Sequence, residues 1–272
     1  MDISRMTIDD YTNLSSEQLE KLRKAIRNEY KTLFEVSVDH RGILAVHQTS
    51  NIRFRLLPGG KYHIGLSSSE EEAARRIADP FPATVEEMRP VFRGFINPLL
   101  VSEVPVTSHV ARTILNTETA INDWNPAWLA EAEGRQVAKA LGCRFLDEVE
   151  WETMCRAGTT TLFPFGDELP DDEVLERWMA YELSDPMALP ANKLGFAGLY
   201  FGEWTNSFFR SSYQSRVTDF GSRVVRGGGA HFWPWQDDEW VWCMSAVRMP
   251  ASALPEGRCA VRLAFDLFRW HT

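Results

Sequence analysis

Apolar residues recur at helical spacing in the first part of the chain. Between residues 16 and 34 they fall on one face, directly after Ser15, whose hydroxyl is well suited to cap a helix. This pattern predicts an amphipathic N-terminal helix. A second helix is predicted after Ser67 and should end before Pro80, because proline disfavours helical geometry in the residue ahead of it.

Strand-like patterns follow these helices. Residues 52–65 alternate between apolar and polar side chains and are interrupted by Pro58-Gly59-Gly60, which predicts a β-hairpin. Residues 95–101 are almost wholly apolar and predict one further strand.

Two more helices are predicted in the middle of the chain. The first should begin at Asn125-Pro126, with asparagine as cap and proline in the first turn, and end at Gly142. The second follows Asp147 and ends near Gly158. After Gly158 the periodicity fades into short strands and loops, and no repeat of fixed period is present. The pattern therefore predicts one α+β domain with an irregular C-terminal half.

Composition and charge narrow the class of protein. Of the 272 residues, 44% are hydrophobic and 25% are charged, which is enough apolar surface for a sizeable core. The net charge of -9 argues against a surface that neutralises many phosphates, so we expect neither nucleic acid nor an anionic membrane as a partner. The chain has no basic and apolar leader at its start and no apolar run long enough to span a bilayer. We therefore expect a cytoplasmic protein.

Short motifs follow one another in a distinctive order between residues 52 and 268. The stretch 144–152 (RFLDEVEWE) is followed by 155–158 (CRAG) and then by 163–168 (FPFGDE). Further members of the series are the segments 58–60, 104–107, 198–200, 203–205, 223–228 and 245–248, and Arg262. In this order the motifs resemble those of the formylglycine-generating enzyme family, also called the sulfatase-modifying factor family.

The resemblance implies a fold. Members of this family have a C-type-lectin-like α+β architecture with low regular secondary structure, in agreement with the pattern of elements. The resemblance also implies a division of the chain, with an N-terminal helical extension over residues 1–50 and a formylglycine-generating-enzyme-like domain over residues 51–272.

The family's copper chemistry is not matched by the residues present. The resemblance implies that formylglycine-generating enzymes oxidise a substrate cysteine with a copper(I) ion held by two cysteines. Those two positions fall on Phe232 and Asp237, and neither side chain supplies the soft thiolate that copper(I) needs. Cys243 and Cys259 remain as weak candidates for a rearranged site, together with His231. We therefore expect no copper or iron cofactor unless the fold assembles such a site.

Two other metals of the wider family are also poorly matched. The branch that uses iron has a helical bundle with spaced histidines, whereas only about 50 residues precede the motifs here and the six histidines lack such spacing. The calcium-binding turn of the family is shortened between Tyr200 and Glu203, which removes two oxygen ligands. A structural calcium ion is therefore not expected.

An aromatic and acidic segment occupies the place of the missing cysteines. Exposed aromatic side chains next to polar groups are typical of binding hot spots, although Trp240 beside Val241 also fits a core. Arg248 stands at a family arginine position downstream. The predicted binding residues are His231, Phe232, Trp233, Trp235, Asp237, Asp238, Glu239, Trp240 and Arg248.

Three hypotheses about function follow. In the first, the chain is a pseudoenzyme that serves as a binding or regulatory module, using its Trp-rich acidic groove for a protein or peptide partner, most readily a basic and extended one. In the second, it is a copper or non-heme iron, O2-dependent oxidoreductase acting on a thiol substrate. In the third, the helix of residues 16–34 docks the partner. The sequence leaves the partner and the oligomeric state open.

Overall fold

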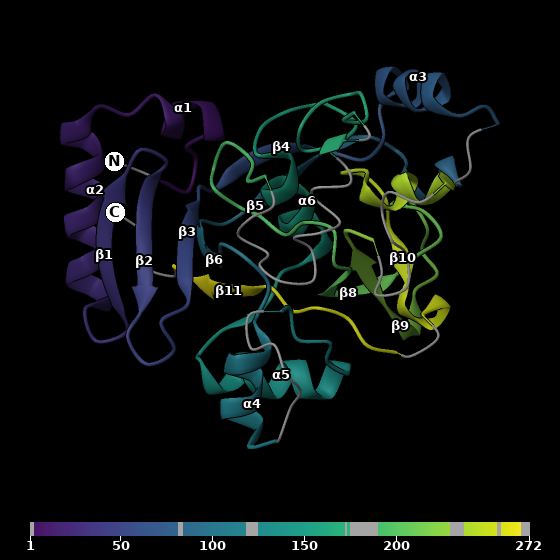
Figure 1. Ribbon diagram of the computed structural model, residues 1–272. Helices are drawn as coiled ribbons and strands as arrows, with labels where there is room; N and C mark the ends of the chain where they lie inside the picture. The colour runs from purple at the N-terminus through teal and green to yellow at the C-terminus, as the bar shows by residue number, and fades with distance from the viewer. Residues whose placement is uncertain are drawn as a thin grey trace.

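The computed structural model describes residues 3–80, 84–117, 125–171, 173–174, 190–228, 237–254 and 257–267 (Figure 1). Its α-helices are α1 (Ile8–Thr12), α2 (Ser16–Tyr30), α3 (Ser68–Ile77), α4 (Ser108–Leu115), α5 (Glu131–Ala140) and α6 (Glu148–Arg156). Its strands are β1 (Phe34–Asp39), β2 (Gly42–His47), β3 (Arg53–Leu57), β4 (Gly60–Ile64), β5 (Phe92–Ile96), β6 (Leu99–Ser102), β7 (Arg144–Phe145), β8 (Glu203–Phe209), β9 (Asp219–Arg226), β10 (Met249–Pro250) and β11 (Leu263–Asp266). Short 3-10 helices are η1 (Val85–Met88), η2 (Asp237–Cys243) and η3 (Ala251–Ala253).

The largest sheet is antiparallel and runs in the order β1-β2-β3-β6-β11-β7. Helix α2 packs against its first two strands, as Figure 1 shows, and buries Leu22 and Ile26 there. The capping box between Ser15 and Gln18 begins this helix, so the predicted N-terminal helix is confirmed. The predicted domain boundary at residue 50 falls between β2 and β3, which are neighbouring strands of this one sheet.

Two smaller sheets complete the described structure. One has three strands in the order β10-β9-β8, and the other is the pair β4-β5. Helix α6 contacts strands of both small sheets, so it lies between them. The mixture of helices with antiparallel sheets confirms the predicted α+β class.

The predicted hairpin of residues 52–65 is wrong. Strand β3 pairs with β2 on one edge and with β6 on the other, which leaves β4 no edge of β3 to join. The chain turns instead at Gly59 and Gly60, and β4 pairs with β5 in a separate sheet. The turn signal was correct, but it joins two sheets rather than two strands of one.

Two other predicted elements need correction. The strand of residues 95–101 is two strands, because the chain leaves β5 after Ile96 and enters β6 in the large sheet at Leu99. The helix predicted from Asn125-Pro126 begins only at Glu131. Bridges from Pro126 to Thr107 and from Leu129 to Cys259 hold the preceding residues extended. These long-range pairings override the local helix signal.

Candidate functional site

An open groove of about 690 Å³ lies between the two small sheets. Its walls come from β5 with the following Asn97, and from residues between Asn206 and Phe220 in and after β8. Its floor is the start of α6, from Asp147 to Glu150. In Figure 1 the three elements lie in the centre of the molecule, with α6 between β5 and β8. We call this space the β5 groove.

Strand β5 presents a free backbone edge to this groove. The strand pairs only with β4, in register from Ile64 opposite Phe92 to Gly60 opposite Ile96. In the described part of the chain, no backbone hydrogen bond joins β5 to any element on its other side. Consecutive residues of β5 line the groove. The outward N–H and C=O groups of β5 are therefore available to an added strand.

Exposed aromatic side chains stand at the groove walls. Phe95 is 55% exposed and Phe220 is 76% exposed, which is unusual for such large apolar rings. Phe220 contacts Phe208 edge to face, with ring centroids 5.2 Å apart, and the guanidinium of Arg223 lies 3.7 Å above the Phe208 ring. The contacts fix Phe208 in place and leave one face of the cluster open to solvent.

The floor of the groove is acidic and backed by buried arginine. Arg248 donates to both carboxylate oxygens of Glu148, at 2.6 and 3.2 Å, and its guanidinium lies 4.4 Å from the centre of the Tyr213 ring. Asp147 is exposed beside Glu148 and makes no ion pair among the described residues. Arg210 is the one positively charged residue of the described groove lining. Arg248, a predicted binding residue, is itself buried and supports the groove from below.

A buried chain of ion pairs holds α6 between the two small sheets. Glu152 on α6 accepts from Arg226 of β9 at 2.7 Å and from Arg156 at 2.9 Å, and the hydroxyl of Tyr213 donates to it at 3.2 Å. Arg156 also donates to Glu70 of α3 at 2.6 Å. Burial alone would raise the pKa of Glu152, but the two adjacent arginines and the Gly65 N–H lower it below the ordinary value.

A second buried pair involves the remaining family motifs. Arg262 of the last motif donates to Glu203 at 2.7 Å, and Trp151 Nε1 donates to the same carboxylate at 2.7 Å. Both charged side chains are fully buried, and Arg262 also donates to carbonyl groups of Ser102 and Ala197. These two motif residues thus cross-link the core, whereas Asp147 to Glu150 of the first motif line the β5 groove.

The described residues include only part of the predicted aromatic and acidic segment. His231, Phe232, Trp233 and Trp235 lie outside the described residues, and for Asp237, Asp238 and Glu239 only the backbone of η2 is described. Trp240 is 3% exposed, with its ring centroid 6.0 Å from that of Phe163. Trp240, in the middle of η2, is therefore part of the core, and a direct binding role for it stays a prediction.

The cysteines are buried or nearly so. Burial raises the pKa of Cys143 and of Cys155 to about 12 and also raises that of Cys259, so these thiols are protonated at neutral pH. Burial, Cys243 and Cys155 raise the pKa of Tyr200, which places these two cysteines in one part of the core. Cys259 lies instead near Glu203. Among the described residues no group of three or more histidine, cysteine, aspartate or glutamate side chains gathers into a metal site.

Comparisons with known proteins agree with this fold. A family model described as the sulfatase-modifying factor enzyme 1-like domain matches residues 45–253. That match covers more than half of the chain, so the protein belongs to the FGE-sulfatase family. The resemblance seen in the motifs and the fold expected from it are thereby confirmed.

Two solved structures share the fold at low sequence identity. PvdO from Pseudomonas aeruginosa is 17% identical, with a TM-score of 0.61 over 80% of this chain and 96% of that one. Treponema denticola variable protein 1 is 11% identical, with a TM-score of 0.55 over 86% of this chain and 99% of that one. No curated protein sequence matches significantly. In the described residues no helix has the length and apolar character of a membrane span.

The pattern of residues along the chain does not indicate the β5 groove. The apolar pattern of residues 95–101 predicts a strand that includes Phe95 but does not indicate that its ring is exposed, and Phe220 stands in a stretch with no strong periodicity. One signal was present. Phe220 follows polar Thr218 and Asp219 and precedes a glycine, a setting in which a buried phenylalanine is unusual.

Proposed function

We propose that this protein is a peptide-binding module that takes up an extended segment of a partner protein along β5, and that it does not generate formylglycine. The observation that carries the proposal is the free edge of β5 beside an open groove. Strand addition at such an edge is a common mode of peptide recognition, in which backbone hydrogen bonds supply affinity and side-chain contacts supply specificity.

The groove suits an extended peptide in particular. The five-residue strand β5 offers a row of backbone groups, and a strand laid beside it would point alternate side chains toward the floor and away from it. Phe95 and Phe220 would contact apolar side chains of the peptide. Asp147 would attract a lysine or arginine in it, so binding should weaken as salt increases.

The proposal that catalysis is absent rests on the residues themselves. Phe232 and Asp237 stand at the two positions where the family resemblance places copper ligands. The family motifs that this chain retains are instead engaged in the buried pairs of Glu152 with Arg226 and of Glu203 with Arg262. Such pairs keep the fold intact whether or not the chemistry is present.

A displayed library of random peptides, selected on the whole protein, tests the proposal. Peptides that bind should lose affinity about tenfold or more when Phe95→Ala and Phe220→Ala are combined, because exposed aromatic rings dominate such contacts. Trp128→Ala is the matched control, since Trp128 is 37% exposed but lies outside the groove lining. An equal loss in the control, or none in the double variant, would reject the groove as the binding surface.

N-methylation of the selected peptide separates strand addition from other modes. Methyl groups on alternate backbone nitrogens should abolish binding in one register and spare it in the other, because only every second N–H of an edge strand faces its neighbour. A peptide insensitive to N-methylation in both registers would show that β5 is not extended by the peptide, even if the aromatic residues contribute.

A further inference from the structure

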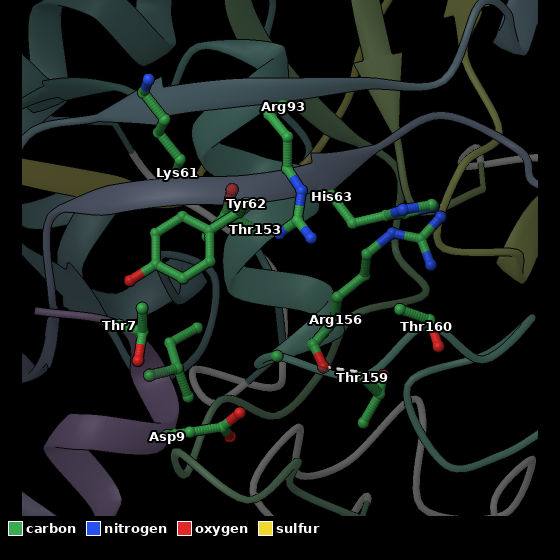
Figure 2. A pocket seen from close by; sticks show the side chains of 12 residues that line it. Thr7, Asp9, Lys61, Tyr62, His63, Arg93, Thr153, Arg156, Thr159 and Thr160 are labelled. Carbon is green, nitrogen blue, oxygen red and sulfur yellow. Dashed lines mark hydrogen bonds between the residues drawn. The ribbon is translucent and has the colours of Figure 1, made fainter.

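A second pocket lies at the end of α6, whereas the β5 groove lies at the start of this helix. Its volume is about 190 Å³ (Figure 2). It is lined by residues 7–9 at the start of α1, by residues 61–63 of β4, by Arg93 of β5, and by residues of α6 and the loop after it, up to Thr160. Figure 2 shows the guanidinium of Arg93 directed into the middle of this space. We call it the α1 pocket.

The α1 pocket carries unpaired positive charge. Within the described part of the chain, neither Arg93 nor Lys61 has an ion-pair or hydrogen-bond partner for its side chain. Arg93 stands directly opposite His63 in the register of the two strands, but His63 Nε2 already lies 3.5 Å from the buried carboxylate of Glu70, so His63 adds no free charge. The side chain of Lys61 points away from the pocket centre in Figure 2. Its ammonium group would attract an anion through its electrostatic field but would not contact it. In a protein of net charge -9, two cations at one pocket without partners among the described residues are a local exception.

The other charges around the pocket are already balanced. Arg156 donates hydrogen bonds to Glu152, to Glu70 and to the carbonyl groups of Gly65 and Thr161. Its positive charge is therefore neutralised by the two buried carboxylates. Asp9 is the one carboxylate of the lining, and its charge is paired with Lys193 at 3.1 Å. Arg93 therefore remains as a guanidinium with all its N–H groups available.

We propose that the α1 pocket binds a small oxyanion, either a phosphoryl or a carboxylate group, through paired hydrogen bonds from Arg93. The fork of a guanidinium matches two oxygens of such a group. The Thr160 hydroxyl, on the loop at the pocket rim, has no side-chain partner in the described structure and supplies a further donor. This site is separate from the β5 groove and does not depend on the peptide-binding proposal.

Isothermal titration calorimetry at low salt tests the proposal. The full chain is titrated with inorganic phosphate in one experiment and with acetate in a second one, the two arms of the test. Saturable binding in either arm is expected, and the tighter arm identifies the ligand class. Arg93→Ala should weaken that binding about tenfold or more, because it removes charge-assisted hydrogen bonds. Asp9→Asn should tighten it, because a competing negative charge is removed.

The matched control is Arg76→Ala, which removes an exposed arginine of α3 outside the pocket. Arg93 has no partner in the described structure, so its loss should leave the thermal unfolding temperature unchanged and the variant folded. An absence of saturable binding in both arms would overturn the proposal. So would equal weakening by Arg76→Ala, since that would mean attraction to the general surface charge, or unchanged binding in Arg93→Ala.

Discussion

At the scale of single residues, Glu152 is the point where the core depends most on charge. Its carboxylate is fully buried and receives Arg226 at 2.7 Å and Arg156 at 2.9 Å. A buried carboxylate is stable only while such partners remain, because the desolvation of each ion costs several kcal/mol. These ion pairs thus hold α6 against β9 through Arg226, and against α3 through the contact of Arg156 with Glu70.

This pairing makes stability depend on pH in a definite direction. The arginines hold the pKa of Glu152 below 4.5 in the folded protein, whereas in the unfolded chain it returns to about 4.5. The unfolded state then binds the proton first as the pH falls, so the contribution of Glu152 is complete above about pH 4.5 and is lost as the pH drops through the lower, folded-state pKa. Glu70 shifts in the same direction.

Glu152→Gln should therefore flatten the acid side of the stability profile. Urea unfolding measured between about pH 7 and pH 3 should show a lower free energy of unfolding for the variant at neutral pH, by about 3 kcal/mol, and a shallower fall toward acid. Glu72→Gln, at an exposed position of α3, is the control and should follow the wild-type curve. If the free energy of unfolding of Glu152→Gln fell toward acid pH as steeply as that of the wild type, Glu152 would not be a source of the pH dependence.

At the scale of elements, the distance between the β4-β5 pair and α6 sets the shape of the groove. Gly94 of β5 lies against the helix, and a Cβ atom there would come within 2.6 Å of Val149 Cγ1 and 2.8 Å of Ile64 Cγ1. The absence of a side chain at Gly94 therefore lets the strand approach the helix this closely.

Gly94→Ala should push the strand pair away from α6. We expect a loss of about 1 to 3 kcal/mol in the free energy of unfolding, the usual effect of overpacking, and weaker binding of the selected peptide because the groove changes shape. Urea unfolding and peptide titration measure the two effects. Gly221→Ala is the control, since Gly221 is exposed and the closest atom to a Cβ there is the carboxylate of Asp219 at 3.2 Å. Unchanged stability and affinity in Gly94→Ala would mean that this contact does not define the groove.

Elements with local signals were predictable from the sequence, and those decided by distant partners were not. The capping residues Ser15, Ser67 and Asp147 marked the starts of α2, α3 and α6, because a cap acts within one turn. The start of α5 was missed because Leu129 pairs with Cys259, 130 positions later. Likewise, the separation of β3 from β4 depends on β6, which no local pattern indicates.

At the scale of the whole molecule, the retained motifs indicate the fold of the family, whereas the missing cysteines argue against its copper chemistry. The motifs predicted the family correctly because their glutamates and arginines build the core. They could not predict a binding surface, because Phe95 and Phe220 belong to no motif. The aromatic and acidic site around Trp233 stays a prediction, since those residues lie outside the described part of the chain.

The pseudoenzyme proposal predicts the result of a copper(I) titration. The anaerobic, reduced protein, titrated against a competing chelator, should bind no tight stoichiometric equivalent, because Cys155 and Cys259 are buried and protonated. Cys243→Ser should behave like the wild type. One tight equivalent that is lost in Cys243→Ser would support the oxygen-dependent oxidoreductase instead.

The free edge of β5 also bears on how the protein behaves when it is concentrated. An unpaired strand beside exposed phenylalanine is a template on which two copies could join edge to edge and begin to aggregate. Arg93 is the second of the five residues of that strand and is exposed. A charged side chain on an edge strand disfavours pairing of that strand with a second copy. We therefore expect Arg93→Ala to increase self-association of the protein at high concentration.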